Sequence, residues 1–282
     1  MTRIIANREK ITNISVMKNK IHERAIVGKN VKIGGNNTIS PNVVIEDGVV
    51  IGSNNLIGPG VVLLNGTTIG DDNFIHTGVV IGDIPQDLAF KNVESFVNIG
   101  NNNRIREYVT IHRGTKENST TKIGHNNFFM GYTHIAHNCQ IGSGVTTVNT
   151  AVLGGYVSVG DSAFISASVV VHQFCRIGKL AMVSGLSAVN QDIPPYLICG
   201  GRPALVSAVN AVGLKRSGLK PEIRTEIKKA FKLLYFSNLN TSNAISAISK
   251  ECSSNEIKYF LDFIKSSSRG ITSAGSGDDY RF

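Results

Sequence analysis

The sequence has no tryptophan, only seven prolines and four cysteines, and an aromatic content of 7%. It contains no run of about eighteen apolar residues, so we expect no membrane-spanning helix and no stable membrane insertion. The opening stretch MTRIIANREK lacks the apolar centre of a secretory signal peptide, which predicts a cytoplasmic protein.

What the sequence does contain is a repeat of six residues. An aliphatic residue recurs at almost every sixth position from Ile21 to Val189, with gaps after Ile81 and Ile111. A period of six fits neither a helix, whose period is about 3.6, nor a single strand, whose period is about 2. It is typical of a parallel β-helix, in which each unit forms one short strand and one corner. We therefore predict a mainly β fold in which residues three units apart stack at about 4.8 Å.

The repeat divides the chain into three parts. Residues 1–20 lack it and are expected to be an N-terminal lead-in. The β-helix is predicted over residues 21–196, interrupted by protruding loops at 82–98 and 112–122, after which the register resumes in phase. Residues 197–282 are predicted to form a small α-helical C-terminal domain.

In that last part the period changes to that of helices. The stretch KPEIRTEIKKAFKLLYF has one apolar face and a proline at its start, and further helices are expected from about Thr241 and Ser253. The tail after Ile271 is expected to be disordered.

The positive charge is concentrated in the same region. Residues 201–282 hold 13 lysines and arginines against 7 acidic residues, out of a net charge of +9 for the whole chain. A phosphate-bearing ligand or an acidic protein partner would fit this charge, although a solvated basic helix face is the commoner cause. No nucleic-acid-binding motif is present, so no nucleic acid partner is predicted.

Two cysteines and the asparagine pairs follow the repeat. Cys139 and Cys175 both lie four residues after a repeat position, which predicts small, buried side chains rather than disulfide or metal partners. Asparagines tolerate left-handed backbone, so the pairs are predicted to turn the corners. These pairs are Asn36–Asn37, Asn54–Asn55, Asn102–Asn103 and Asn126–Asn127.

Histidines are the strongest candidates for chemistry. Of the seven, His112, His134, His137 and His172 fall within a few coils of one another. Gln173 should lie two coils above His137, with Gly155 between them, which leaves room for a substrate beside a general base. The alternative is that corners simply tolerate polar residues. A metal site using His134, His137 and Cys139 is weakly supported, because Cys139 should point inward, so neither a metal nor a cofactor is predicted.

Several strings together resemble the UDP-N-acetylglucosamine acyltransferases, the enzymes of the first step of lipid A synthesis. The resemblance covers nearly the whole chain. The strings are IREYVTIHRGT (Ile105–Thr115), HIAHNC (His134–Cys139), VHQFC (Val171–Cys175), QDIPPY (Gln191–Tyr196), GLKRSG (Gly213–Gly218) and the PQDL loop (Pro85–Leu88).

The resemblance implies a left-handed coil and a homotrimer with active sites between neighbouring coils. It implies that His137 takes the proton of the sugar 3-hydroxyl, which attacks the thioester of a 3-hydroxyacyl chain on acyl carrier protein. The Gly155 N–H would stabilise the oxyanion. Substrate contacts are implied for Gln86, Asp87, Leu88, His112, His134, Tyr156, His172, Gln173, Gly185, Asn210 and Arg216. Gly185 matches the position that measures acyl length, and a glycine there favours a long chain.

The chain departs from the family pattern at Asn138, Tyr156, Ala89, Ser217 and Val212. Asn138 replaces an acidic residue that often follows the catalytic histidine, and an amide stabilises an imidazolium less than a carboxylate does. These departures leave open the acylation of a 3-amino UDP-sugar. Independent alternatives are the later UDP-3-O-acyl-glucosamine N-acyltransferase step and, more remotely, a zinc carbonic anhydrase with the same coil or a non-catalytic scaffold.

Overall fold

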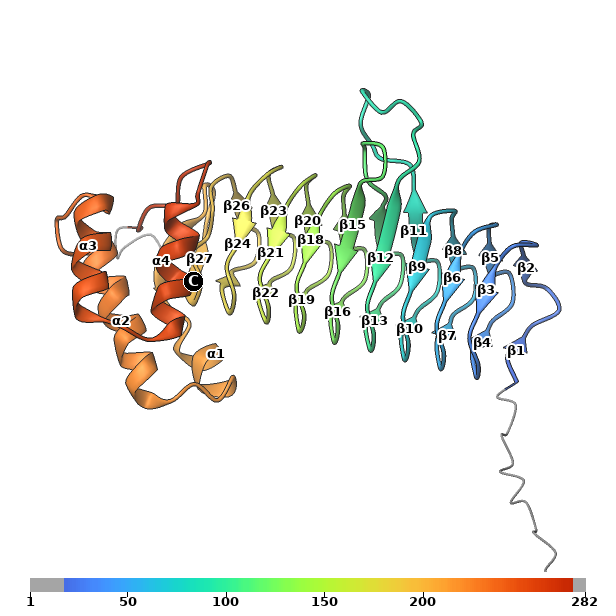
Figure 1. The fold of residues 1–282 in the computed structure, drawn as a ribbon, viewed down its shortest axis with the longest axis horizontal. Coiled ribbons are helices and arrows are strands. Elements are labelled where there is room, and N and C mark those ends of the chain that lie inside the picture. The colour runs from blue at the N-terminus through green and yellow to red at the C-terminus, as the bar shows by residue number, and fades with distance from the viewer. Residues whose placement is uncertain (1–17, 276–282) are drawn as a thin grey trace, which may run out of the picture.

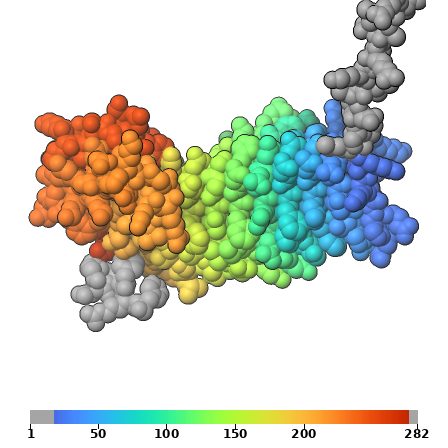
Figure 2. All heavy atoms as spheres, turned by 90° about the horizontal axis from the view of Figure 1, so that it is seen from below, coloured from blue at the N-terminus to red at the C-terminus, as the bar shows by residue number. Residues whose placement is uncertain are grey.

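A computed structural model describes residues 18–275, and residues 1–17 and 276–282 lie outside the described part. Short strands stack into a long three-sided coil, and a helical domain covers its C-terminal end (Figures 1 and 2). Within residues 18–275, no helix combines the length and the apolar character that crossing a membrane requires.

The coil has three sheets, which we call A, B and C. Sheet A contains β1 (Lys20–Ile21), β4 (Thr38–Ile39), β7 (Leu56–Ile57), β10 (Phe74–Ile75), β13 (Arg104–Ile105), β16 (Phe128–Phe129), β19 (Thr146–Thr147), β22 (Phe164–Ile165), β25 (Met182–Val183), β27 (Leu197–Gly200) and β28 (Leu205–Val209). Sheet B contains β2 (Ile26–Val27), β5 (Val44–Ile45), β8 (Val62–Leu63), β11 (Val80–Asp83), β14 (Thr110–His112), β17 (His134–Ile135), β20 (Val152–Leu153), β23 (Val170–Val171) and β26 (Ala188–Val189). Sheet C contains β3 (Lys32–Ile33), β6 (Val50–Ile51), β9 (Thr67–Ile69), β12 (Phe96–Ile99), β15 (Thr120–Ile123), β18 (Gln140–Ile141), β21 (Ser158–Val159) and β24 (Arg176–Ile177).

The six-residue repeat produces this architecture because the repeat residue lies at or near the end of each short strand, in most of them as its second residue, and points inward. Ile57, Ile75 and Ile135 are completely buried. Strands of successive coils pair in parallel, as in Thr146–Thr147 against Phe164–Ile165. The repeat thus fills the interior with one aliphatic side chain per strand, and burial of this apolar column is the main stabilising term.

The corners are made differently from what the asparagine pairs predicted. The first member of each pair has a left-handed backbone, with φ of 61° at Asn36 and Asn54. The second member is not left-handed but buried, and its side-chain oxygen accepts the backbone N–H of the next coil. Asn37, for example, accepts from Asn55 at 2.8 Å, and Asn55 accepts from Asn73 at 2.8 Å. The second asparagines therefore satisfy buried amides instead of turning the chain.

Two loops leave the coil on the same side (Figure 1). They span residues 84–95 and 113–119, since the ends of the predicted ranges 82–98 and 112–122 continue as strands. The loops touch each other, because the Asn118 N–H donates to the Glu94 carbonyl at 2.9 Å. Both leave from the edge where sheet B passes to sheet C.

The C-terminal domain contains α1 (Ala211–Arg216), α2 (Pro221–Tyr235), α3 (Thr241–Glu251) and α4 (Asn255–Lys265). Two predicted boundaries need correction. Residues 197–200 still belong to the coil, since β27 pairs in parallel with β25. The tail is ordered beyond Ile271, because Thr272 is buried and its N–H donates to the Asp192 carbonyl at 2.9 Å. The rest of the predicted tail lies outside the described residues, as does most of the lead-in.

Candidate active site

His137 sits where the chain leaves β17 and turns from sheet B to sheet C. The turn is made by Asn138, whose backbone is left-handed with φ of 60°. The Tyr156 N–H donates to the His137 carbonyl at 2.9 Å, and the Phe174 N–H donates to the Gly155 carbonyl at 3.0 Å. These two bonds fix His137, Gly155 and Gln173 one above another, as the spacing predicted.

The imidazole of His137 lies directly against the bare Cα of Gly155. A Cβ on Gly155 would come within 2.3 Å of His137 Cε1 and 2.5 Å of Nε2. No residue between 18 and 275 accepts a hydrogen bond from the Gly155 N–H. Nε2 of His137 therefore lies close to Gly155, whose backbone N–H has no acceptor among the described residues, although His137 as a residue is only 5% exposed.

The other ring nitrogen of His137 is held by its neighbour. His137 Nδ1 lies 3.1 Å from Asn138 Oδ1, and this oxygen also accepts from the Thr115 N–H at 3.0 Å and from the Thr115 hydroxyl at 2.9 Å. Thr115 comes from loop 113–119 and also contacts the Tyr156 hydroxyl at 2.9 Å. Thr115 was not among the predicted site residues, because nothing in its local sequence shows that the loop folds back onto His137.

His112 and His134 lie beside this corner on sheet B. Their rings meet edge to face, with centroids 4.9 Å apart. Burial, reinforced by the charges of His112 and His137, lowers the pKa of His134 to about 4. Burial also lowers the pKa of His112, against the raising effect of Asp83. Both rings are therefore neutral near pH 7, and His134 Nδ1 is placed by the Thr110 hydroxyl at 2.7 Å.

The remaining predicted residues on this edge are accessible. His172 and Gln173 are exposed, and His172 Nδ1 lies 3.0 Å from the Gln173 carbonyl. Tyr156 lies edge-on to His137, with ring centroids 5.3 Å apart, and stacks on Phe174 at 4.9 Å. The stretch Gln86–Leu88 lies in loop 84–95, where Asp87 Oδ1 accepts the Ala89 N–H and Leu88 is fully exposed.

Three predicted residues lie elsewhere in the chain. Gly185 is at the edge where sheet A passes to sheet B, and a Cβ there would meet only Ala167 O at 3.4 Å and Ser166 Cβ at 3.9 Å. Asn210 and Arg216 line a cavity of about 550 Å³ beside sheet A, at the edge where sheet C passes to sheet A. One chain therefore does not bring these residues to His137.

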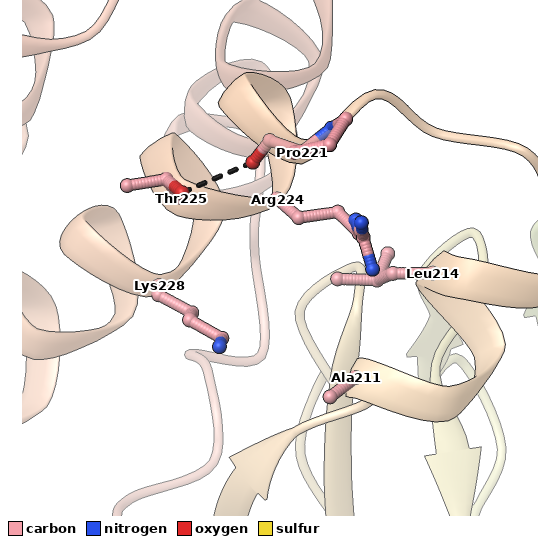
Figure 3. Close-up of a pocket in the computed structure, with 6 residues that line it drawn as sticks. All are labelled: Ala211, Leu214, Pro221, Arg224, Thr225 and Lys228. Carbon is pink, nitrogen blue, oxygen red and sulfur yellow. Dashed lines mark hydrogen bonds between the residues drawn. The ribbon is translucent and has the colours of Figure 1, made fainter.

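A second, smaller cavity of about 210 Å³ lies between α1 and α2. Arg224 and Lys228 of α2 face it, while Leu214 and Ala211 line its other side (Figure 3). None of the predicted site residues lines it. Its two cations belong to the basic C-terminal region recognised from the sequence.

Two of the cysteines have thiols inside the coil, and that of Cys139 donates to the Gly154 carbonyl at 3.2 Å. Cys139 and Cys175 are buried, and burial raises the pKa of the Cys139 thiol to about 12 and that of Cys175 to about 11. The described residues contain no group of three or more histidine, cysteine or acidic side chains placed to hold a metal ion.

Comparison with known proteins gives consistent family matches. A family model described as UDP-N-acetylglucosamine O-acyltransferase, domain 2, matches residues 192–272, and a bacterial transferase hexapeptide model matches residues 48–83 and 120–155. The acyl-(acyl-carrier-protein)–UDP-N-acetylglucosamine O-acyltransferase of Synechocystis sp. is 43% identical over 188 residues, which cover 67% of this chain and 68% of that protein.

Solved structures agree over most of the chain. A UDP-N-acetylglucosamine acyltransferase from Bacteroides fragilis has 44% identity and a TM-score of 0.76, covering 90% of this chain and 97% of the other. The enzyme from Francisella novicida has 39% identity and a TM-score of 0.87, with 91% and 95% covered.

The coil of hexapeptide repeats and the matched relatives place this chain among the hexapeptide-repeat acyltransferases. Within that class, this chain belongs to the UDP-N-acetylglucosamine acyltransferase family. The predicted resemblance, the left-handed β-helix with a small helical domain, and the acyltransferase class of enzyme are thereby confirmed.

Proposed function

We propose that this enzyme transfers a 3-hydroxyacyl chain from acyl carrier protein to the 3-hydroxyl of UDP-N-acetylglucosamine. Relatives are named for acyl transfer between these two substrates. The observation that carries the mechanism is the contact of the His137 imidazole with the bare Cα of Gly155, whose N–H has no acceptor within the described residues.

The reaction needs one base and one oxyanion donor. Nε2 of His137 takes the proton of the sugar 3-hydroxyl, and the oxygen attacks the thioester carbonyl carbon. The Gly155 N–H donates to the carbonyl oxygen as it becomes negative. When the C–S bond breaks, the imidazolium returns its proton to the departing sulfur, so an ester and a free thiol result.

The neutral histidines and the loop support sugar recognition. His134 and His112 stay uncharged near pH 7, so each can donate or accept a hydrogen bond beside His137 without repelling the imidazolium that forms. Gln86, Asp87 and Leu88 project from the coil on loop 84–95, where they can reach a second chain (Figure 1). His172 and Gln173 continue the same edge toward the C-terminal domain.

A homotrimer would complete the site. The His137 edge and the cavity of Asn210 and Arg216 lie on different edges, so one chain cannot present both to one substrate. Packing sheet A of one chain against sheet B of the next would bring the two edges together. The outward residues support this packing, because sheets A and B present many apolar side chains whereas those of sheet C are mostly polar. They include Phe74, Phe164 and Met182 on sheet A, Val62, Val80 and Val170 on sheet B, and Lys32, Lys122 and Gln140 on sheet C.

Light scattering on the purified protein should give three times the chain mass of 30.3 kDa.

The decisive test uses purified protein, a mixture of acyl-carrier thioesters and UDP-N-acetylglucosamine, with the product identified by mass spectrometry. We expect a 3-O-acyl ester from wild type and almost none from His137→Ala. Normal turnover by His137→Ala would refute the general-base role. An amide formed only from the 3-amino UDP-sugar, or acylation only of a UDP-3-O-acyl-glucosamine, would transfer the assignment to one of the related N-acyl reactions.

A further inference from the structure

We propose that Thr115 and Tyr156 are positioning residues that fix the tautomer of His137 in the absence of a carboxylate at position 138. This inference rests on the proposed function, in which Nε2 of His137 must be unprotonated. It assigns a role to the second of the two inserted loops, residues 113–119, which interrupts the repeat between β14 and β15.

The Thr115 backbone determines the orientation of the Asn138 amide. A backbone N–H can only donate, so the Asn138 atom 3.0 Å from it must be the carbonyl oxygen. His137 Nδ1 lies 3.1 Å from that same oxygen. Nδ1 must therefore carry a hydrogen, and in the neutral ring Nε2 is left as the acceptor that faces Gly155.

The direction of the remaining hydrogen bonds follows. The Thr115 hydroxyl lies 2.9 Å from Asn138 Oδ1, which only accepts, so the hydroxyl donates to it. The Tyr156 hydroxyl, 2.9 Å from Thr115 Oγ1, then donates to the threonine oxygen. The chain runs from Tyr156 to Thr115 to Asn138, and His137 donates to the same amide oxygen from the other side. Linked donors polarise one another and make the final acceptor oxygen more negative.

This arrangement suits an uncharged acceptor. A carboxylate would attract the Nδ1 hydrogen by its own charge, whereas an amide offers only a dipole and could rotate to present its NH₂ group instead. The Thr115 N–H opposes that rotation, because it would then face two hydrogens. The Asn138 backbone is also held, since its N–H donates to Thr121 Oγ1 at 2.7 Å.

Both positioning residues are themselves well held. Loop 113–119 is closed by the Ser119 hydroxyl, which donates to the Lys116 carbonyl at 2.7 Å, and is tied to the first loop through Asn118. The Tyr156 ring is sandwiched between the edge contact to His137 and the stacked Phe174 ring. Its hydroxyl can therefore be removed without moving the ring.

The test uses three small substitutions. Thr115→Val removes the hydroxyl but keeps the backbone N–H, Thr115→Ser restores the hydroxyl, and Tyr156→Phe removes only the end of the chain. We expect kcat to fall about tenfold in Thr115→Val, the effect of one lost hydrogen bond to a catalytic group, with KM for the UDP-sugar unchanged. Thr115→Ser should stay near wild type, and Tyr156→Phe should fall by about threefold. The exposed Thr68 of sheet C provides the matched control, Thr68→Val.

Asn138→Asp separates positioning from a purely structural effect. A carboxylate holds the Nδ1 hydrogen by charge, so Thr115→Val in the Asn138→Asp background should cost less than about twofold. An equal loss in both backgrounds, or wild-type kcat in Thr115→Val, would overturn the proposal.

A spectroscopic measurement makes the proposal independent of turnover. In protein with ¹⁵N-labelled histidine, His137 should be the Nδ1–H tautomer both in wild type and in Thr115→Val, whose backbone N–H still orients Asn138, but the Nδ1–H hydrogen bond should be weaker in the variant, as the ¹⁵N and ¹H chemical shifts would show. An Nε2–H tautomer in wild type would overturn the positioning role even if acyl transfer occurs. Absence of acyl transfer together with the Nδ1–H tautomer would instead refute the proposed function.

Discussion

Adding a single methyl group at Gly155 should disable the enzyme without unfolding it. In Gly155→Ala, the new Cβ would lie 2.3 Å from His137 Cε1, 2.5 Å from Nε2 and 3.0 Å from Nδ1. Non-bonded carbon atoms rest at about 3.5–4.0 Å, so the imidazole must move by about 1 Å or more. Its own backbone cannot yield easily, because the His137 carbonyl is bonded to the Tyr156 N–H of the next coil.

The size of the effect follows from this displacement. A 1 Å misplacement of a catalytic group costs about a hundredfold in rate, which corresponds to about 2.7 kcal/mol of transition-state stabilisation. The free energy of unfolding should fall by only about 1–3 kcal/mol, the usual cost of one extra methyl group in a packed site. We therefore expect kcat/KM to drop about a hundredfold in a protein that remains folded.

The assay is steady-state transfer to UDP-N-acetylglucosamine, with circular dichroism to monitor folding. Gly131 offers a matched control, because it also lies two residues after a repeat position and Gly131→Ala would place its Cβ no closer than 3.2 Å to Asn149 Nδ2. The double variant with His137→Ala isolates the cause, because the methyl group can displace only an imidazole that is present. Wild-type kcat/KM in Gly155→Ala, or an equal loss with and without the imidazole, would refute the reasoning.

Three further predictions concern the carrier protein, the acyl chain and pH. The basic C-terminal region suits an acidic protein partner, so Arg224→Glu and Lys228→Glu, at the cavity between α1 and α2, should each raise KM for the acyl-carrier thioester about tenfold at low salt and less at high salt. Lys250→Glu on α3 should leave this KM unchanged, as steady-state kinetics at two ionic strengths would establish. Gly185→Met should shift the product toward shorter acyl chains, because only ordinary contacts surround the glycine and a longer side chain would fill the space beside it. An unchanged distribution of acyl chain lengths by mass spectrometry would count against Gly185 as the length-determining position. The pKa of His134 is lowered from 6.5 to about 4, so the unfolded chain takes up this proton first as the pH falls. The free energy of unfolding should therefore fall by about 2 kcal/mol more in wild type than in His134→Gln between pH 8 and pH 5. An equal decrease in both proteins, measured by denaturant titration at each pH, would contradict the burial of this ring.

Much of the fold could be predicted because one rule holds along the coil. A repeat residue every six positions assigns the strands of the coil, their inward side and their partners, which lie eighteen residues away except where a loop intervenes. The stacking of His137, Gly155 and Gln173 followed by counting. The burial of Cys139 followed from the same count. Such local, periodic information is lost only where the chain leaves the coil.

What could not be predicted depends on contacts that the repeat does not encode. Loop 113–119 folds back over the corner, so Thr115 meets Asn138 and Tyr156 across 23 and 41 residues of sequence. The buried role of Asn37 was missed because an asparagine suits a left-handed turn and a buried amide equally well, and only the coil above decides between them. The ordered Thr272 depends on a hydrogen bond to Asp192, which no local composition reveals.

The division between coil and loops has a chemical consequence. His137 and Gly155 belong to adjacent coils about 4.8 Å apart, and the backbone bonds between those coils determine the position of the proposed base and the proposed oxyanion donor before any substrate arrives. Preorganised groups of this kind need no reorganisation during the reaction, which is why they stabilise a transition state better than mobile ones do. In the proposed mechanism, recognition belongs to the parts that lie outside the stack: loop 84–95, loop 113–119 and the helical domain. An amide at position 138 can then be compensated by Thr115 of a loop, while the coil keeps the same distance between the proposed base and the proposed oxyanion donor.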